Sequence, residues 1–278
     1  MRRLIYYELI KTFLKKRTYI GFAIVALIIP LIEVAMKLEG GRFIQMTTRQ
    51  LQQDFFFVGN LFNGWFVSYG LMNSLWIHMP LLIAFVAGDI LAGEATAGTY
   101  RLILVRPISR TQILFSKYCS TAFYTIIFVL FLAALSIGLA IPLLGRGDLL
   151  IMDKGVLVLP EDDVAWRFIV AYALAAWSML TIASIAFFFS SFVENAIGPM
   201  VGTMGVLIVF TIIMVIPVEL FESIRPYLFT HYINVWQKAF LDPIPWSEVL
   251  TSLGVLGLYS MSCVVTAWII FLKKDILS

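Results

Sequence analysis

Charged residues are scarce in this sequence of 278 residues: 13% are Asp, Glu, Lys or Arg, whereas 61% are hydrophobic. A typical soluble domain carries about 25% charged residues. So few charges cannot cover the apolar surface that a soluble fold of this length would expose, and a composition this apolar also excludes a disordered chain. We therefore expect a protein that lies mostly in lipid.

Cysteine and histidine are rarer still, with two residues of each. Cys119 and Cys263 lie in apolar runs, at a spacing that suits neither a zinc site nor a disulfide framework. His78 and His231 form no His-Glu-x-x-His pair, and the sequence has no Gly-x-Ser-x-Gly elbow. We therefore expect no enzyme, no metal ligand set and no cofactor site in this chain.

Long apolar runs, in contrast, are abundant. A membrane-spanning helix needs about 20 mostly apolar residues. The runs of that kind are Tyr19–Met36, Gly64–Ile90, Cys119–Leu144, Trp166–Ser190, Ala196–Pro217 and Leu250–Leu272. They predict an all-α, polytopic integral membrane protein with six transmembrane helices, in which residues 1–278 form a single transmembrane domain. The second run is long enough to tilt strongly or to include an interfacial segment.

Basic residues are unevenly distributed along the chain. Lys and Arg gather at both termini and in residues 93–118, whereas most acids lie in 145–165 and 218–249. Cytoplasmic loops carry the excess of Lys and Arg, so we expect both termini on the cytoplasmic side of the plasma (inner) membrane. Residues 145–165 are then an outer loop. Residues 218–249, rich in Pro, Trp and Tyr, are expected to form outer re-entrant or interfacial helices.

The first 18 residues predict an amphipathic helix. Its apolar face holds Tyr6, Ile10, Leu14, Ile5, Leu9 and Phe13, and its polar face holds Glu8, Lys11, Thr12 and Lys15. Such a helix lies in the headgroup layer with its cations on anionic lipid, as an interfacial elbow helix. The alternative is a simple N-terminal extension of the first span.

Few ionisable residues lie in or beside the predicted spans. Glu33, Asp89 and Glu194 all sit near predicted ends, where they reach headgroups or water. A proton- or ion-driven carrier needs acids near the midplane, so their positions argue against secondary transport.

Gly198, Gly202 and Gly205 form a small-residue stripe in the fifth span. Such stripes let helices approach closely. This one serves either packing within the subunit or a dimer seam or pore lining.

The most distinctive stretch is Gly93–Lys117, which is too apolar for a free loop and too charged to span. A phosphate-binding loop needs Lys after its final Gly, and Thr99 stands there instead, so ATP is not bound by that device. A short helix over 100–104 is expected to end at Pro107, and Ser109 is expected to cap a second helix. The segment is either a rigid docking element for another protein or a hairpin lying on lipid.

The residues of this stretch resemble the signature of type-2 ATP-binding-cassette (ABC) exporter permeases. The matching positions are Gly93-Glu94, Gly98-Thr99, Leu102, Leu104, Pro107, Ser109-Arg110 and Lys117. The elbow helix, six spans and outer helical hairpin are similar too, while Arg106 and the longer outer segments depart from the pattern. The resemblance implies a permease subunit that pairs with a second copy or a related chain, and a separate cytoplasmic ATPase that binds ATP and Mg.

Under this hypothesis the ATPase-coupling residues are Glu94, Gly98, Thr99, Arg101, Leu102, Pro107, Ser109, Arg110 and Glu194. Glu94 and Arg101 would contact the ATPase or the elbow helix, and Leu102 would fill a groove of the partner. Membrane lipid is a further partner, and nucleic acid is not expected. Two alternatives remain open: an assembly or maturation factor that acts on an extracytoplasmic client through 145–165 and 218–249, and a secondary transporter.

Overall fold

The computed structural model describes residues 1–48, 62–96, 108–152, 155–193, 195 and 197–273. Its elements, in order, are α1 (Arg2–Leu14), η1 (Lys16–Thr18), α2 (Tyr19–Thr48), α3 (Gly64–Trp76), α4 (Met79–Thr96), α6 (Arg110–Leu144), β1 (Leu149–Met152), β2 (Val156–Leu159), α7 (Glu161–Phe192), α8 (Gly198–Val215), α9 (Glu219–Glu222), η3 (Arg225–Tyr227), α10 (Phe229–Tyr232), η4 (Val235–Phe240) and α11 (Trp246–Lys273). The described chain is therefore almost wholly helical, as its composition predicts.

Five of these helices are long and apolar enough to cross a membrane, namely α2, α6, α7, α8 and α11, and the bent pair α3–α4 makes up to six over the described residues. Their lengths follow from the apolar runs, because about 20 apolar residues are needed to cross the hydrocarbon core. The all-α class and the presence of several such helices are confirmed.

The second predicted run is not one continuous helix. α3 and α4 meet at an angle of 53° across Ile77 and His78. Pro80 lies in the first turn of α4, where its missing N–H removes no helical hydrogen bond, whereas in a helix continued from α3 its ring would clash with the Trp76 carbonyl four residues earlier. The break therefore falls just before this proline.

Residues 145–165 are not an ordinary loop, and that prediction is wrong. β1 and β2 form an antiparallel hairpin with Leu149 opposite Leu159 and Met152 opposite Val156. Leu149 and Leu150 are buried, so the first strand covers part of the apolar core next to α3. Asn63 caps α3 and donates its side-chain amide to the Asp148 carbonyl oxygen at 2.7 Å, which ties the hairpin to the helix.

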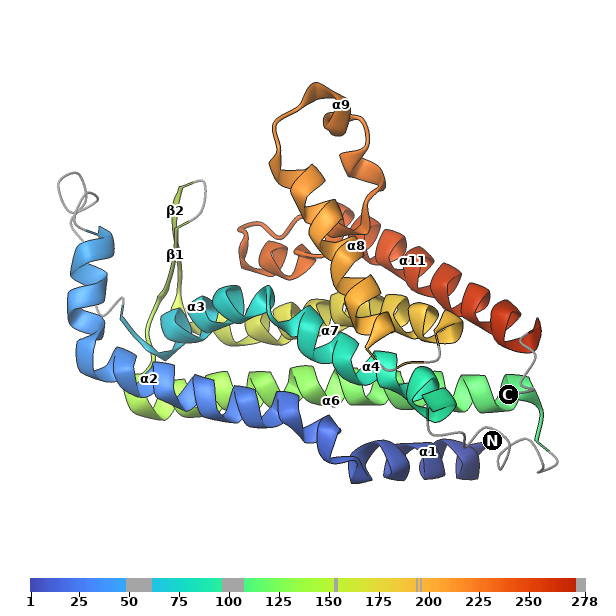
Figure 1. Cartoon of the computed structure of the whole chain (residues 1–278). Helices are drawn as coiled ribbons and strands as arrows, with labels where there is room; N and C mark the ends of the chain where they lie inside the picture. The colour runs from blue at the N-terminus through green and yellow to red at the C-terminus, as the bar shows by residue number, and fades with distance from the viewer. Residues whose placement is uncertain (49–61, 97–107, 153–154, 194, 196, 274–278) are drawn as a thin grey trace.

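α7 is the central helix: 67% of its 18-residue apolar stretch is buried, against 11% of the corresponding stretch of α8. It packs against α4, α6, α8, α11 and η4. Figure 1 shows α2, the α3–α4 pair, α6 and α7 running alongside one another, with α8 rising away from them toward α9. Residues 218–249 contain the short helices α9, η3, α10 and η4, and their expected place at the outer face stays a prediction.

The bundle has two ends, a basic end and a hairpin end. The basic end comprises α1, the last turns of α4, the first turns of α6 and the last turn of α11. The hairpin end comprises β1–β2, α3, η4 and the first turns of α11 and α7 (Figure 1).

Candidate functional site

The polar face of α1 is turned inward. Glu8 and Thr12 are buried, while the apolar Tyr6, Tyr7 and Leu14 are exposed. Thr12 lies 3.0 Å from the Ser120 hydroxyl of α6. The prediction that the charges of this helix face the lipid headgroups is wrong, because α4 and α6 present opposite charges on which the polar face can pack.

Lys117 of α6 is at the centre of this contact and is wholly buried, with 0% exposure. Its Nζ lies 2.9 Å from Glu8 Oε2 and 2.6 Å from Glu94 Oε1. Lys11 of α1 also binds Glu94. Two lysines and two glutamates therefore join α1, α4 and α6 in one ion network, which is buried except for the partly exposed Lys11.

Asp89 extends the network by one turn of α4. Its carboxylate accepts hydrogen bonds from Lys15 Nζ at 2.8 Å and from Arg17 Nη1 at 3.2 Å. Gly93 lies against the Asp89 carboxylate, so a Cβ added at Gly93 would collide with the Asp89 oxygen. The expectation that Asp89 reaches headgroups or water is wrong, because the basic residues after α1 fold back over it.

Buried ions are stable only when they are paired and hydrogen-bonded, and removing one partner of such a pair costs about 3–5 kcal/mol. The network therefore fixes α1 against the last turn of α4 and the first turns of α6. These turns are the ones that precede and follow residues 97–107 in the chain.

Three of the predicted coupling residues lie in the described chain, and all three are at the basic end. Glu94 contacts α1, one of the two partners expected for it. Ser109 caps α6 by accepting from the Gln112 backbone N–H at 3.2 Å, which confirms the predicted cap. Arg110 donates to the Leu272 carbonyl oxygen at 3.0 Å and so holds the end of α11.

The other coupling residues, Gly98, Thr99, Arg101, Leu102, Pro107 and Glu194, lie outside the described residues, as does the short helix expected over 100–104.

The glycine stripe on α8 is divided between two environments. A Cβ at Gly198 would meet Val193 at 2.8 Å, and one at Gly202 would meet the Phe189 ring at 3.3 Å. A Cβ at Gly205 would meet nothing within 4 Å. Gly198 and Gly202 therefore serve packing within this chain, while Gly205 faces open space.

Glu33 does not lie at a helix end, contrary to expectation. α2 continues to Thr48, so Glu33 stands halfway along a helix of 30 residues. It is 0% exposed, and neither of its carboxylate oxygens has a hydrogen-bond partner among the described residues. The prediction failed because the sequence run became polar after Met36 although the helix continued.

At the hairpin end, Arg167 of α7 is a buried cation that the sequence analysis missed. It donates to the carbonyl oxygens of Ala239 and Leu241 at 3.2 and 2.6 Å. Ion pairs with Asp163 and Asp242 complete its contacts. The spacing of Asp163 and Arg167 on an apolar helix was an available signal, since residues four apart share a helix face.

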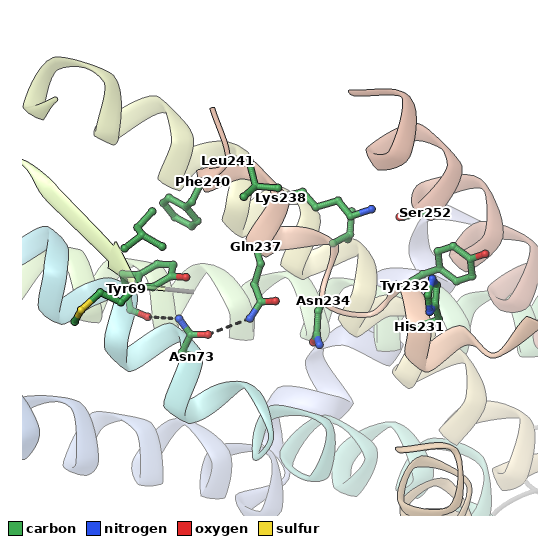
Figure 2. A pocket seen from close by; sticks show the side chains of 13 residues that line it. Tyr69, Asn73, His231, Tyr232, Asn234, Gln237, Lys238, Phe240, Leu241 and Ser252 are labelled. Atoms are coloured by element: carbon green, nitrogen blue, oxygen red, sulfur yellow. Dashed lines mark hydrogen bonds between the residues drawn. The ribbon is translucent and has the colours of Figure 1, made fainter. Parts of the chain in front are cut away.

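A cavity of about 350 Å³ lies beside Arg167 and its partners; polar and apolar side chains line it in similar measure, and it is named the polar cavity because its neighbour is mostly apolar. Its lining comprises Tyr69, Asn73, Ile151, Met152, His231, Tyr232, Asn234, Val235, Gln237, Lys238, Phe240, Leu241 and Ser252. Figure 2 shows Asn73 and Gln237 pointing toward each other from α3 and η4, with the Gln237 amide donating to Asn73 Oδ1 at 3.1 Å. Trp76 Nε1 donates to Asn234 Oδ1 at 2.7 Å, a second link between the same elements.

A second cavity, of about 310 Å³, lies between α2, α3 and β1. Its lining is mostly apolar and includes Ile32, Met36, Phe66 and Leu71. Tyr69, Asn73 and Met152 line both cavities. Cavities of this size accommodate small ligands.

No group of three or more His, Cys, Asp or Glu side chains in the described part of the chain is arranged to hold a metal ion. The chemistry offered by the two ends is therefore ionic pairing at one and hydrogen bonding around cavities at the other.

A family model described as "Protein of unknown function (DUF2705)" matches residues 23–277. The chain belongs to this family. "Uncharacterized protein YhcI" of Bacillus subtilis (strain 168) is 27% identical over 206 residues, which are 70% of this chain and 64% of that protein. The match thus covers less than two thirds of the relative's length.

The family assignment drawn from residues 93–117 is therefore wrong. The match over nearly the whole chain is to DUF2705, and neither that family nor the relative is described as a type-2 ABC exporter permease. The resemblance rested on short motifs, and part of it has a purely local cause: a serine such as Ser109 is favoured at the start of any helix.

Proposed function

We propose that this DUF2705 protein is the membrane-spanning subunit of an ATP-driven exporter whose ATP is hydrolysed by a separate cytoplasmic subunit. The supporting observation is the buried ion network at the basic end. Lys117 and Glu94 connect α1 to the two helices that border residues 97–107. A protein docked on that segment would move these three helices together.

In this proposal the chain crosses the plasma membrane six times, with α3–α4 as one bent span and both termini in the cytoplasm. The basic end is then cytoplasmic, in agreement with the positive-inside rule. α1 lies at the interface with its apolar face in lipid and its polar face on the bundle. The hairpin end faces outward.

The proposed partner within the membrane is a second copy of the chain or a related one. α8 supports this part, because Val201, Val209 and Val215 are exposed along it and Gly205 leaves open space. Small residues next to branched apolar ones allow close approach of two helices in lipid.

The test is co-purification of the tagged full chain, expressed with the proteins encoded beside it in its genome. We expect an ATPase subunit at a one-to-one ratio and its loss in the Leu102→Asp variant. The matched control is Leu220→Asp, which places the same change on exposed Leu220 of α9 at the far side of the molecule. The absence of an ATPase from the unmodified chain, or its retention by Leu102→Asp, contradicts the proposal.

Glu33 favours a second candidate, proton- or ion-coupled transport without an ATPase. A carboxyl group buried halfway along an apolar helix is a functional candidate by default, because its burial is costly. This candidate predicts transport by the chain alone in ATP-free vesicles, abolished in Glu33→Gln. Dependence of transport on the ATPase would instead support the first proposal. Crosslinking of the hairpin end to a protein client would favour a maturation factor.

A further inference from the structure

We infer that the two adjoining cavities at the hairpin end form one binding site for an anionic amphiphile, with its phosphate-bearing headgroup in the polar cavity and its acyl chain in the apolar cavity. The inference names the substrate class for the proposed export function and, as far as transport is concerned, rests on that function. The binding itself is a property of this chain alone.

The polar cavity suits a headgroup that carries negative charge. Its lining includes Lys238, Asn234 and Gln237, which carry ammonium and amide groups, but no Asp or Glu. Lys238 is held 2.9 Å from Glu248, whose side chain is 64% exposed and outside the lining. Ammonium and amide N–H groups donate strong hydrogen bonds to phosphate oxygens.

The apolar cavity suits a hydrocarbon chain. Ile32 and Met36 of α2 face Phe66 and Leu71 of α3 across it. Gly70 also lines this space, and a Cβ added there would meet nothing within 4 Å. Burial of a chain in such a cavity is favoured by roughly 0.8 kcal/mol for each CH₂ group removed from water.

The connection between the cavities decides in favour of one amphiphile over two separate ligands. Tyr69, Asn73 and Met152 line both spaces, so a ligand that fills one touches the wall of the other. Trp236 packs beside this border, with its ring centroid 6.1 Å from that of Tyr69.

The experiment uses the purified full chain in detergent and a short-chain phosphatidylglycerol with brominated acyl chains, which quench tryptophan fluorescence on contact. We expect saturable quenching, with roughly tenfold weaker binding in Lys238→Gln because one charge-assisted hydrogen bond is lost. Gly70→Leu should weaken binding of the lipid by roughly tenfold or more, because the new side chain occupies the space of about two CH₂ groups or more.

Gly138→Leu on α6 is the matched control for the glycine variant. A Cβ there also meets nothing within 4 Å, and Gly138 lines neither cavity, so binding should match that of the unmodified chain. Lys238→Gln changes a partly exposed side chain and keeps the inference testable if Gly70→Leu does not fold.

Two outcomes overturn the inference. Equal quenching by phosphatidylcholine of the same chain length, unchanged in both variants, means bulk lipid contact only. Competition by glycerol phosphate without any effect of Gly70→Leu means a free phosphate ligand. Neither measurement needs ATP or a partner, so the result is independent of the ATPase co-purification.

Discussion

The basic end and the hairpin end use polar residues in opposite ways. At the basic end, Glu8, Glu94 and Lys117 are buried and paired, and the space beside Asp89 is only about 10 Å³. At the hairpin end, exposed amides and one partly exposed lysine surround about 350 Å³ of open cavity. One end is built to hold helices together, whereas the other leaves polar groups and space for a ligand.

Under the proposed function, the two ends are suited to different tasks, with force acting at the basic end and substrate binding at the hairpin end. Buried ion pairs in a tight contact resist separation, because each ion left behind would be unpaired in a medium of low polarity. Hydrogen bonds between exposed amides, such as that of Asn73 with Gln237, can exchange with water or a ligand at little net cost. Under the proposed export function, the ion network and the cavities would serve different parts of the transport cycle.

The largest effect is expected from Lys117→Met. Removing this buried ammonium group leaves Glu8 with no ion-pair partner among the described residues, and should lower the free energy of unfolding by about 3–5 kcal/mol. Denaturation by SDS in mixed micelles measures it. Lys238→Met, which removes the partly exposed lysine at the hairpin end, is the control and should have a much smaller effect. Equal losses of stability in the two variants would contradict the stated difference between the two ends.

A smaller loss of stability is expected from Arg167→Met, which tests whether the buried contacts of Arg167 hold η4 in place at the hairpin end. The carbonyl oxygens of Ala239 and Leu241 would lose a charged donor, at a cost of about 2–3 kcal/mol. Hydrogen exchange should rise in η4 and leave the α1 amides unchanged. Faster exchange at both ends would show that the two ends are not independent.

The smallest effects are expected on α8, which belongs to neither end. Gly202→Val should destabilise the chain by about 1–2 kcal/mol because Phe189 already lies at 3.3 Å from an added Cβ. Gly205→Ala should stabilise the isolated chain by up to about 1 kcal/mol, since the space is open and alanine favours helix. Thermal unfolding measures both. If Gly205→Ala stabilises the isolated chain but abolishes a dimer seen by light scattering, the dimer interface lies at this residue.

Local sequence signals predicted much of the fold. The apolar runs located the long helices because a helix that crosses lipid must be mostly apolar along its whole length. Ser109 was recognised as a cap because the cap hydrogen bond reaches only to Gln112. Pro80 accounts for the break that the sequence analysis did not place. The β1–β2 hairpin was missed because its strands have only four residues each.

The candidate sites were much less predictable. Glu8 meets Lys117 over a separation of 109 residues, and Lys15 meets Asp89 over 74. Helical periodicity correctly placed Glu8 and Lys11 on one face of α1 but could not tell whether this face meets lipid headgroups or protein. Glu33 was misplaced for a similar reason, because α2 extends past its apolar run and the neighbouring helices bury the residue.

The class of this protein follows from its composition. Few charges and many long apolar runs favour an all-α chain with several helices fit for a membrane, because helices satisfy their own backbone hydrogen bonds in lipid. The packing of the helices sets which charges are paired, that Glu33 has no hydrogen-bond partner among the described residues, and where cavities lie. The physical reason is that helix formation depends on neighbours three or four residues away, whereas ion pairs and cavities form between helices that the chain brings together over long separations.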